Sequence, residues 1–178
     1  MRIPILLWAA IAVGATAPAF AAKHHVAPRH EAPAAAAPSQ IGQFGDWTAA
    51  RYLHEGQTIC YAFTRAKSVH PPEAGATPPL LTVTERAASR DEVAITEHGP
   101  YPQETTVTVQ VGRAGLDFYT SGSDAFARDG TATVAALRPG SQAIARGPGP
   151  RAGSRIEIFS LSGFTAAYAA IVKACPAK

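Results

Sequence analysis

The sequence predicts a mostly β domain, sandwich-like or barrel-like, with one C-terminal α-helix packed on a sheet. Two observations predict this fold. Short segments rich in β-branched residues recur about every dozen residues between glycine and proline turns, a pattern typical of sandwiches and barrels. The last segment, residues 158–176, instead places apolar side chains at intervals of three and four, which is the spacing of an amphipathic helix.

The first residues predict a signal for export. Arg2 precedes an apolar run over Ile3–Ala17, and Ala19-Phe20-Ala21 has the small-x-small pattern of a cleavage site. We therefore expect a signal peptide over residues 1–21. A retained membrane anchor is the alternative, because apolar residues extend to Ala22 and approach the length of a bilayer span.

Residues 22–42 are rich in proline and alanine, and we expect them to form a disordered linker. Such a composition buries too little apolar surface to offset the lost chain entropy. His24, His25 and His30 lie in this linker and could bind a metal through neutral imidazoles. Pro28 interrupts their spacing and no cysteine accompanies them, so a solvated linker is favoured and no metal or cofactor is expected.

Residues 43–178 have the size of one ordinary domain. The whole chain carries 16 basic and 13 acidic side chains, a formal charge of +3 that is too small to imply a nucleic-acid partner. Its two cysteines, Cys60 and Cys175, allow one intramolecular disulfide in an oxidising compartment. Buried free thiols are the alternative if the signal peptide fails. Because the chain contains no asparagine, Asn-linked glycosylation is excluded.

Eight segments of the domain are expected to form strands. They are Trp47–Tyr52, Thr58–Thr64, Leu80–Glu85, Glu92–Glu97, Thr105–Val111, Leu116–Thr120, Ser141–Arg146 and Arg155–Ser160. A loop with four prolines is expected over Ser68–Pro79, and two helical turns over Thr131–Leu137. Alternation places Val107, Val109 and Val111 on the inward face of their strand.

Alternation also divides the segment over residues 58–64. Ile59, Tyr61 and Phe63 face one way, while Cys60 and Ala62 form a face of small residues that leaves room for a helix to pack closely.

The C-terminal helix is expected to begin near Gly163. Its apolar stripe contains Phe164, Ala167, Tyr168, Ile171, Val172 and Cys175. Ser162 is placed to supply an N-cap oxygen, and Pro176 cannot continue the helix, so both ends are marked.

Three segments together resemble a known family. They are Phe44-Gly45-Asp46-Trp47, Thr58-Ile59-Cys60-Tyr61-Ala62-Phe63 and the C-terminal helix. Over residues 44–176 the chain resembles the invasion-associated locus B family of secreted bacterial proteins. The resemblance implies a non-enzymatic exported protein, periplasmic or extracellular and linked to entry into host cells. Its partner would be an envelope or host protein or an anionic polymer.

No catalytic constellation stands out. Ser162 lacks the first glycine of a nucleophile elbow, and Asp91 and Glu92 would point to opposite faces of a strand. His54, His70 and His98 are spread over three expected loops. A small periplasmic hydrolase with its site among these loops is the alternative function, and it requires two of the histidines and a carboxylate to meet in one pocket.

The sequence offers one candidate binding patch. No acidic residue lies between Asp129 and Glu157, whereas four arginines do: Arg138, Arg146, Arg151 and Arg155. Together they could bind the phosphate or sulfate groups of an anionic polymer. The alternative is a solvated hairpin whose charges protect an edge strand from pairing with other chains.

Most aromatic side chains are expected in the core, because they lie in periodic segments of a β domain that needs large fillers. This set is Trp47, Tyr61, Phe63, Phe118 and Phe164. Tyr101 and Tyr119 lie next to expected turns and are the candidates for an exposed recognition surface.

Overall fold

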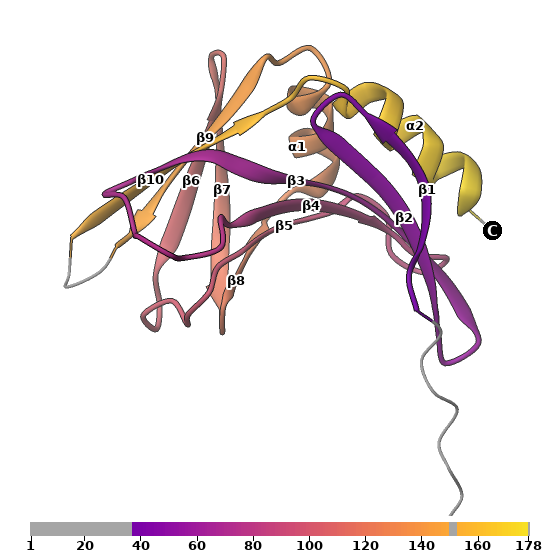
Figure 1. Ribbon diagram of the computed structural model, residues 1–178, viewed down its shortest axis with the longest axis horizontal. Coiled ribbons are helices and arrows are strands. Elements are labelled where there is room, and N and C mark those ends of the chain that lie inside the picture. The colour runs from indigo at the N-terminus through magenta and orange to yellow at the C-terminus, as the bar shows by residue number, and fades with distance from the viewer. Residues whose placement is uncertain (1–36, 150–152, 178) are drawn as a thin grey trace, which may run out of the picture. The chain divides into compact units, whose positions relative to one another are not determined.

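The computed structural model describes residues 37–149 and 153–177 (Figure 1). This part of the chain forms one ten-stranded sheet and two helices. The strands are β1 (Ser39–Phe44), β2 (Trp47–His54), β3 (Gln57–His70), β4 (Leu80–Glu85), β5 (Glu92–Thr96), β6 (Thr106–Val111), β7 (Ala114–Ser121), β8 (Asp124–Ala127), β9 (Gln142–Pro148) and β10 (Ser154–Ser160). The helices are α1 (Gly130–Leu137) and α2 (Phe164–Ala174). The expected signal peptide lies outside the described residues.

Eight of the strands close into a barrel, in the order β3-β10-β9-β6-β7-β8-β5-β4 with β4 pairing back to β3. Strand β3 makes this closure possible because it is 14 residues long. Along one edge it pairs first with β2 and then with β10, and along the other it pairs with β4. The hairpin of β1 and β2 extends the sheet beyond the barrel (Figure 1). The predicted mostly β, barrel-like fold is confirmed.

Glycines in two-residue turns set the register of four hairpins. Glu55-Gly56 joins β2 to β3 with φ angles of 49° and 77°, the pair of positive values that a type I′ turn requires. Gly45, Gly112 and Gly122 each occupy the first position of the other turns, with φ of 54°, 57° and 60°. Only glycine adopts this backbone conformation without steric cost, so each of these glycines marks the turn at which one strand ends and the next begins.

The barrel interior is packed with apolar side chains. Val107, Val109 and Val111 of β6 face inward as predicted and are at most 4% exposed. They join a continuous buried cluster that also contains Leu81, Val83, Val93, Ile95, Phe118 and Phe159. A closed barrel of eight strands is just wide enough for side chains to fill it. The centre of this barrel is therefore a core.

Helix α2 packs across β1, β2 and β3 (Figure 1). Phe164, Ala167 and Ile171 of its predicted stripe are fully buried. They face the same continuous core as the small residues Ala49 and Ala62, which allow the helix to approach the sheet closely. Helix α1 adds Val134 and Leu137 to this core, and the Asp129 side chain caps it by accepting a hydrogen bond from the Ala132 N–H at 2.8 Å.

The start of α2 is fixed by a glycine contact. The N-cap residue is Gly163, with φ of 91° and no side-chain cap, so the prediction that Ser162 caps the helix is wrong. A Cβ atom on Gly163 would lie 1.8 Å from the carbonyl oxygen of Phe44. The Asp46 N–H donates to the Ser162 carbonyl at 3.0 Å. The helix therefore begins in direct backbone contact with the turn between β1 and β2.

Trp47 completes this junction. Its indole Nε1–H donates to the Ser160 carbonyl at 3.0 Å, and its ring packs edge-on against Phe164 with centroids 4.8 Å apart. The Thr64 hydroxyl donates to the carbonyl of the neighbouring Asp46 at 2.8 Å. The Phe44-Gly45-Asp46-Trp47 motif thus contacts β3, β10 and the start of α2.

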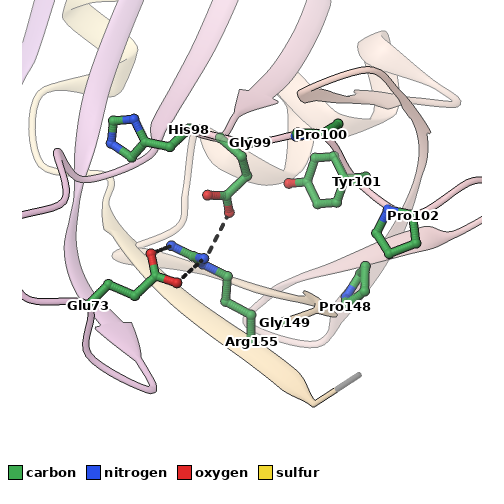
Figure 2. Close-up of a pocket in the computed structure, with 10 residues that line it drawn as sticks. Glu73, His98, Gly99, Pro100, Tyr101, Pro102, Pro148, Gly149 and Arg155 are labelled. Carbon is green, nitrogen blue, oxygen red and sulfur yellow. Dashed lines mark hydrogen bonds and ion pairs between the residues drawn. The ribbon is translucent and has the colours of Figure 1, made fainter. Parts of the chain in front are cut away.

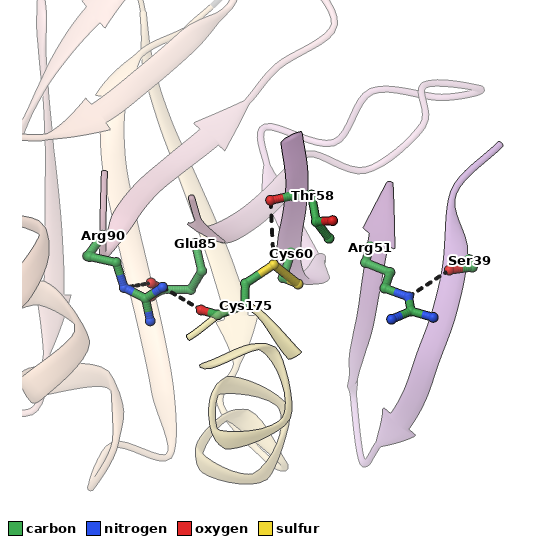
Figure 3. The surroundings of a disulfide bond; sticks show 7 residues. All are labelled: Ser39, Arg51, Thr58, Cys60, Glu85, Arg90 and Cys175. Carbon is green, nitrogen blue, oxygen red and sulfur yellow. Dashed lines mark hydrogen bonds and ion pairs between the residues drawn. A yellow bond between two sulfur atoms is a disulfide. The ribbon is translucent and has the colours of Figure 1, made fainter. Parts of the chain in front are cut away.

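The C-terminal end of α2 is held by a covalent bond and a buried ion pair (Figure 3). Cys60 and Cys175 form the predicted disulfide, with Cα atoms 5.9 Å apart. Arg90 donates to the Cys175 carbonyl at 2.6 Å and pairs through Nε with the fully buried Glu85 at 2.5 Å. Burial raises the pKa of Glu85 to about 7, and the charge of Arg90 opposes this shift.

Three sequence-based boundaries need correction. Strand β1 begins at Ser39, so the expected linker over residues 22–42 ends too late. Strand β3 continues through His70, into the expected loop, because β10 pairs with its last residues. Strand β8, which was not predicted, is a four-residue segment between β7 and β5. The last residues of β3 form a strand because β10, far along the chain, pairs with them, whereas β1 pairs only with the adjacent β2, and β8 pairs with the adjacent β7 and with β5.

The aromatic residues of β3 also depart from the expectation. Trp47, Phe118 and Phe164 are fully buried as predicted, but Tyr61 and Phe63 are only partly buried. The alternation itself is correct, since Cys60 and Ala62 are fully buried. The small-residue face is the inner one, and the two rings stack on each other on the outer face with centroids 5.9 Å apart.

Removal of the disulfide should destabilise the domain and loosen α2 first. The bond joins residues 115 positions apart, and the chain-entropy estimate for a loop of this size is about 4 to 5 kcal/mol. We expect a Cys60→Ala, Cys175→Ala double variant to lose a stability of this order in urea denaturation. Hydrogen exchange should rise in α2 before it rises in β6. Equal loss of protection in both elements would contradict this order.

A methyl group at Gly163 should be far more costly than one at Gly56. Both glycines have positive φ, but a Cβ on Gly56 has no neighbour within 4 Å, whereas one on Gly163 overlaps the Phe44 carbonyl. We expect Gly56→Ala to cost about 1 kcal/mol and Gly163→Ala about 2 kcal/mol more, or to prevent folding. Chemical denaturation of the two variants measures the difference. Equal costs would show that the contact with Phe44 does not restrict the site.

Candidate functional site

A pocket of about 250 Å³ lies at the end of the barrel away from the helices, and Figure 2 shows residues that line it. Helix α1 leads into the start of β9, whereas Pro148 and Gly149, which line the pocket, lie at the end of that strand. Likewise Asp91, before β5, accepts hydrogen bonds from both helices, whereas Glu97, after β5, lines the pocket. We call this place the mouth pocket. Its lining is Glu73, Glu97, His98, Gly99, Pro100, Tyr101, Pro102, Pro148, Gly149 and Arg155.

Arg155 of β10 organises the mouth pocket (Figure 2). Its terminal nitrogens donate to the two carboxylate oxygens of Glu73, each at 3.3 Å. Its Nε lies 2.9 Å from Glu157 Oε1 and 3.3 Å from Glu97 Oε1. These carboxylates come from the loop after β3, from the end of β5 and from β10 itself. One guanidinium therefore ties together three segments that are distant in sequence.

The acids around Arg155 lie in a water-poor environment. The side chains of Glu97 and Glu157 are 7% and 5% exposed. Burial raises the pKa of Glu157 to about 9, with a further contribution from its hydrogen bond to Glu97, while Arg155 opposes the shift. The buried site therefore favours the protonated form of Glu157 more than water does.

Tyr101 lies beside this ion network and is mostly buried, so the prediction that it is an exposed recognition residue is wrong. Burial, with the charges of Glu157 and Glu97, raises the pKa of its phenol well above the usual range. The hydroxyl therefore remains a proton donor at the pocket. Tyr119 does match the prediction, since it is 44% exposed and its ring stacks on Phe126.

The four arginines of the predicted anion-binding patch are not equivalent. Arg155 is paired with carboxylates and is not free to hold a phosphate or sulfate. Arg138 lies over the ring of Tyr168 at 4.8 Å from its centroid, and Arg146 is exposed on β9. Arg151 lies outside the described residues. The sequence could not show that Arg155 is paired, because two of its acidic partners, Glu73 and Glu97, lie far from it in sequence.

The three loop histidines do not share the pocket. His98 lines it, and its Nε2 contacts the carbonyl oxygen of Thr77. His54 and His70 lie near opposite ends of β3, and neither is among the lining residues. The pocket thus brings one histidine together with carboxylates, whereas the hydrolase hypothesis requires two.

The sequence analysis missed the constellation of Glu73, Glu97, Tyr101 and Glu157. A local signal existed for part of it: Arg155, Glu157 and Phe159 are two residues apart in a strand and so share one face. Phe159 is fully buried, which places the two charged residues on the inner face as well. The described residues contain no group of three histidine, cysteine or acidic side chains placed to hold a metal ion. Neither helix in residues 37–149 and 153–177 has the length and apolarity to span a membrane.

The raised pKa of Glu157 predicts a pH dependence of stability. Its pKa is higher in the folded protein than the usual 4.5, so the folded state binds a proton that the unfolded state releases. The free energy of unfolding should therefore fall as pH rises from about 5 to about 9, by at most about 1.4 kcal/mol per pH unit from this group.

The Glu157→Gln variant should lack this contribution. Relative to the unaltered protein, we expect it to gain stability steadily between pH 5 and pH 8 in urea denaturation. The effect of Glu85 is present in both proteins and cancels in the difference. Parallel stability curves over this range would contradict the assignment.

Comparison with known proteins gives a fold relationship. No family model matches the chain, and no curated protein matches its sequence. Among solved structures, the crystal structure of invasion associated protein B from Bartonella henselae is similar, with a TM-score of 0.56 and 17% sequence identity. The similarity covers 76% of this chain and 96% of that chain. The resemblance noted in the sequence is therefore confirmed at the level of the fold, which this chain shares with invasion associated protein B.

Proposed function

We propose that this chain is a non-enzymatic exported interaction protein that meets an envelope or host partner at the mouth pocket. The observation that carries the proposal is the preformed pocket, whose walls are held in place by the ion pairs of Arg155 with Glu73, Glu97 and Glu157. Preorganised surfaces bind with a smaller loss of entropy than mobile ones.

The engagement of the charged groups favours binding over catalysis. A general acid or base must be free to exchange a proton with its substrate. In the mouth pocket Arg155 is occupied by three carboxylates, and the ring of His98 contacts the Thr77 carbonyl. These groups are arranged to stabilise loops. This arrangement supports an interaction protein more than the alternative of a small periplasmic hydrolase.

Export and a link to host-cell entry belong to the same proposal. The disulfide between Cys60 and Cys175 fits an oxidising compartment such as the periplasm or the exterior. The similar fold belongs to a protein named for its association with invasion. We extend both properties to this chain as expectations, with an envelope or host protein as the partner.

Site-specific photocrosslinking in intact cells tests the proposal. A photoreactive residue at the exposed Gln103, next to the mouth pocket, should give one discrete crosslinked product. The matched control carries it at Arg113, which is also exposed but lies in the turn between β6 and β7. No product is expected there, because β6 separates this turn from the mouth pocket.

The products discriminate between the hypotheses. Excess unlabelled domain should compete for the product from Gln103. Identical products from both positions, or a product from Arg113 alone, would overturn the proposal. Hydrolysis of an envelope polymer by the purified protein, abolished by His98→Ala, would support the hydrolase instead.

A further inference from the structure

Three aromatic side chains form a continuous row on the outer face of β2 and β3. We call Tyr52, Tyr61 and Phe63 the aromatic ladder. The ring centroids of Tyr52 and Tyr61 lie 5.8 Å apart with planes at 73°, and those of Tyr61 and Phe63 lie 5.9 Å apart with planes at 23°. None of the three belongs to the buried core or to the side chains packed on it. The ladder is therefore a feature of the protein surface.

Neither helix of the described chain covers the ladder. The residues that alternate with it on β3, Cys60 and Ala62, are fully buried and face α2 on the opposite side of the sheet. Helix α1 contacts β5. Exposed aromatic groups that form one patch mark binding surfaces, whereas single scattered ones do not. The outer face of β2 and β3 is therefore open to a ligand.

The ladder rings also lie over smaller apolar neighbours. Ile59 and Ala50 point to the same outer face and stand opposite Tyr52 and Tyr61 in the strand register, yet they are only 4% and 5% exposed. An outward residue of a strand is covered this well where larger side chains beside it lean across the sheet, and the two tyrosines are such neighbours. Their rings thus cover apolar residues on one side and turn the other side to solvent.

Uncharged side chains surround the ladder. The residues paired with it in the strand register are Ile59, Ala50, Thr84, Thr48 and Thr82, and none carries a charge. Three of them are threonines, so hydroxyl groups border the rings of Tyr61 and Phe63.

Charged residues lie at the margins of this face. Arg65 follows Phe63 by two positions on β3, and Arg86 pairs with Glu92 at 3.4 Å. A guanidinium and a carboxylate paired in this way present no net charge to a ligand. The ladder thus offers aromatic rings and hydroxyl groups in an uncharged setting, which suits a neutral ligand better than a phosphorylated or sulfated polymer.

We infer that the aromatic ladder binds an uncharged sugar chain of the cell envelope. A sugar ring has a face of C–H groups and a rim of hydroxyls, and the electron-rich face of an aromatic ring attracts C–H groups. The sugar hydroxyls then lie beside those of Thr82, Thr84 and the two tyrosines. The envelope is the source because the disulfide fits the periplasm, the first oxidising compartment that an exported chain enters. The inference goes beyond the proposed function, since no ladder residue lines the mouth pocket.

NMR titration of the unaltered protein tests the ligand class. The probes are the β-1,4-linked tetramers of N-acetylglucosamine and of glucose, and the matched control is the sulfated glucose tetramer, which keeps the skeleton and adds negative charge. At least one neutral tetramer should shift the amide signals of Tyr52, Tyr61 and Phe63 saturably and leave Tyr101 of the mouth pocket unchanged. The sulfated tetramer should bind at least five times more weakly.

Three outcomes of this titration would overturn the inference. They are tighter binding of the sulfated tetramer, the absence of saturable shifts with both neutral probes, and shifts at Tyr61 and Phe63 that appear on simple dilution without sugar. The first would assign the face to an anionic polymer, and the last to a second copy of this chain.

Tyr119 supplies a matched control for the ladder. It is the more exposed aromatic side chain, at 44%, but its ring already stacks on Phe126 with centroids 5.6 Å apart, and the Arg128 guanidinium lies over it at 5.7 Å from the centroid. A ring engaged in this way is not expected to bind a sugar.

Ring-removing variants test the role of the ladder. Tyr61→Leu and Phe63→Leu each remove one ring and keep an apolar side chain on the strand, and each should weaken binding of the neutral tetramer at least tenfold. Tyr119→Leu should change it less than twofold. Insoluble glycan prepared from the envelope should sediment the unaltered protein and leave the two ladder variants in solution. Equal effects of all three substitutions would contradict the assignment.

If the ladder variants do not fold, the comparison of neutral and sulfated tetramers on the unaltered protein still decides, because the shifted amide signals identify the face that binds. Saturable binding at the ladder supports the inference even if crosslinking from Gln103 gives no product. The two proposals therefore fail separately.

Discussion

The fold depends on one edge of β3 that serves two partners. Up to Phe63 this edge pairs with Thr48 of β2, and from Ala66 onward it pairs with β10. Where β2 ends and β10 takes over, the Trp47 indole donates to the Ser160 carbonyl and the Asp46 N–H to the Ser162 carbonyl, while the Thr64 hydroxyl of β3 donates to the Asp46 carbonyl. The same place receives the start of α2. A motif that carries no chemistry is therefore the point at which barrel, hairpin and helix are joined.

Sequence reasoning succeeded where the pattern is local. The valines of β6 and the stripe of α2 follow directly from periods of two and 3.6 residues. It failed where partners come from far along the chain. Strand β8 has only four residues, too few to show a periodic pattern in the sequence. The last residues of β3 form a strand only because β10 pairs with them. Arg155 belonged to a basic stretch in sequence and to an acidic cluster in space. Most of the candidate site could therefore not be predicted from the sequence without the strand order.

The two buried ion clusters occupy opposite ends of one apolar core. At the helical end Arg90 joins Glu85 to the last turn of α2, and at the mouth Arg155 joins three loops and strands. Burial of an ion pair contributes little net stability, but breaking it by removing one partner is costly. Such pairs select a particular arrangement of the segments they join. In this protein they define both ends of the barrel, while the valine and phenylalanine layers between them supply the hydrophobic stabilisation.

The position of α2 at the end of the chain also sets the order in which parts of the fold can form. A chain leaves the ribosome with its N-terminus first. The hairpin of β1 and β2 is therefore present long before the helix that covers it, and Trp47 must wait for Phe164 and Ser160 to arrive. During that interval its apolar inner face is exposed, which is the condition in which chaperones bind nascent chains. Truncation before Phe164 would leave the face that α2 covers permanently exposed.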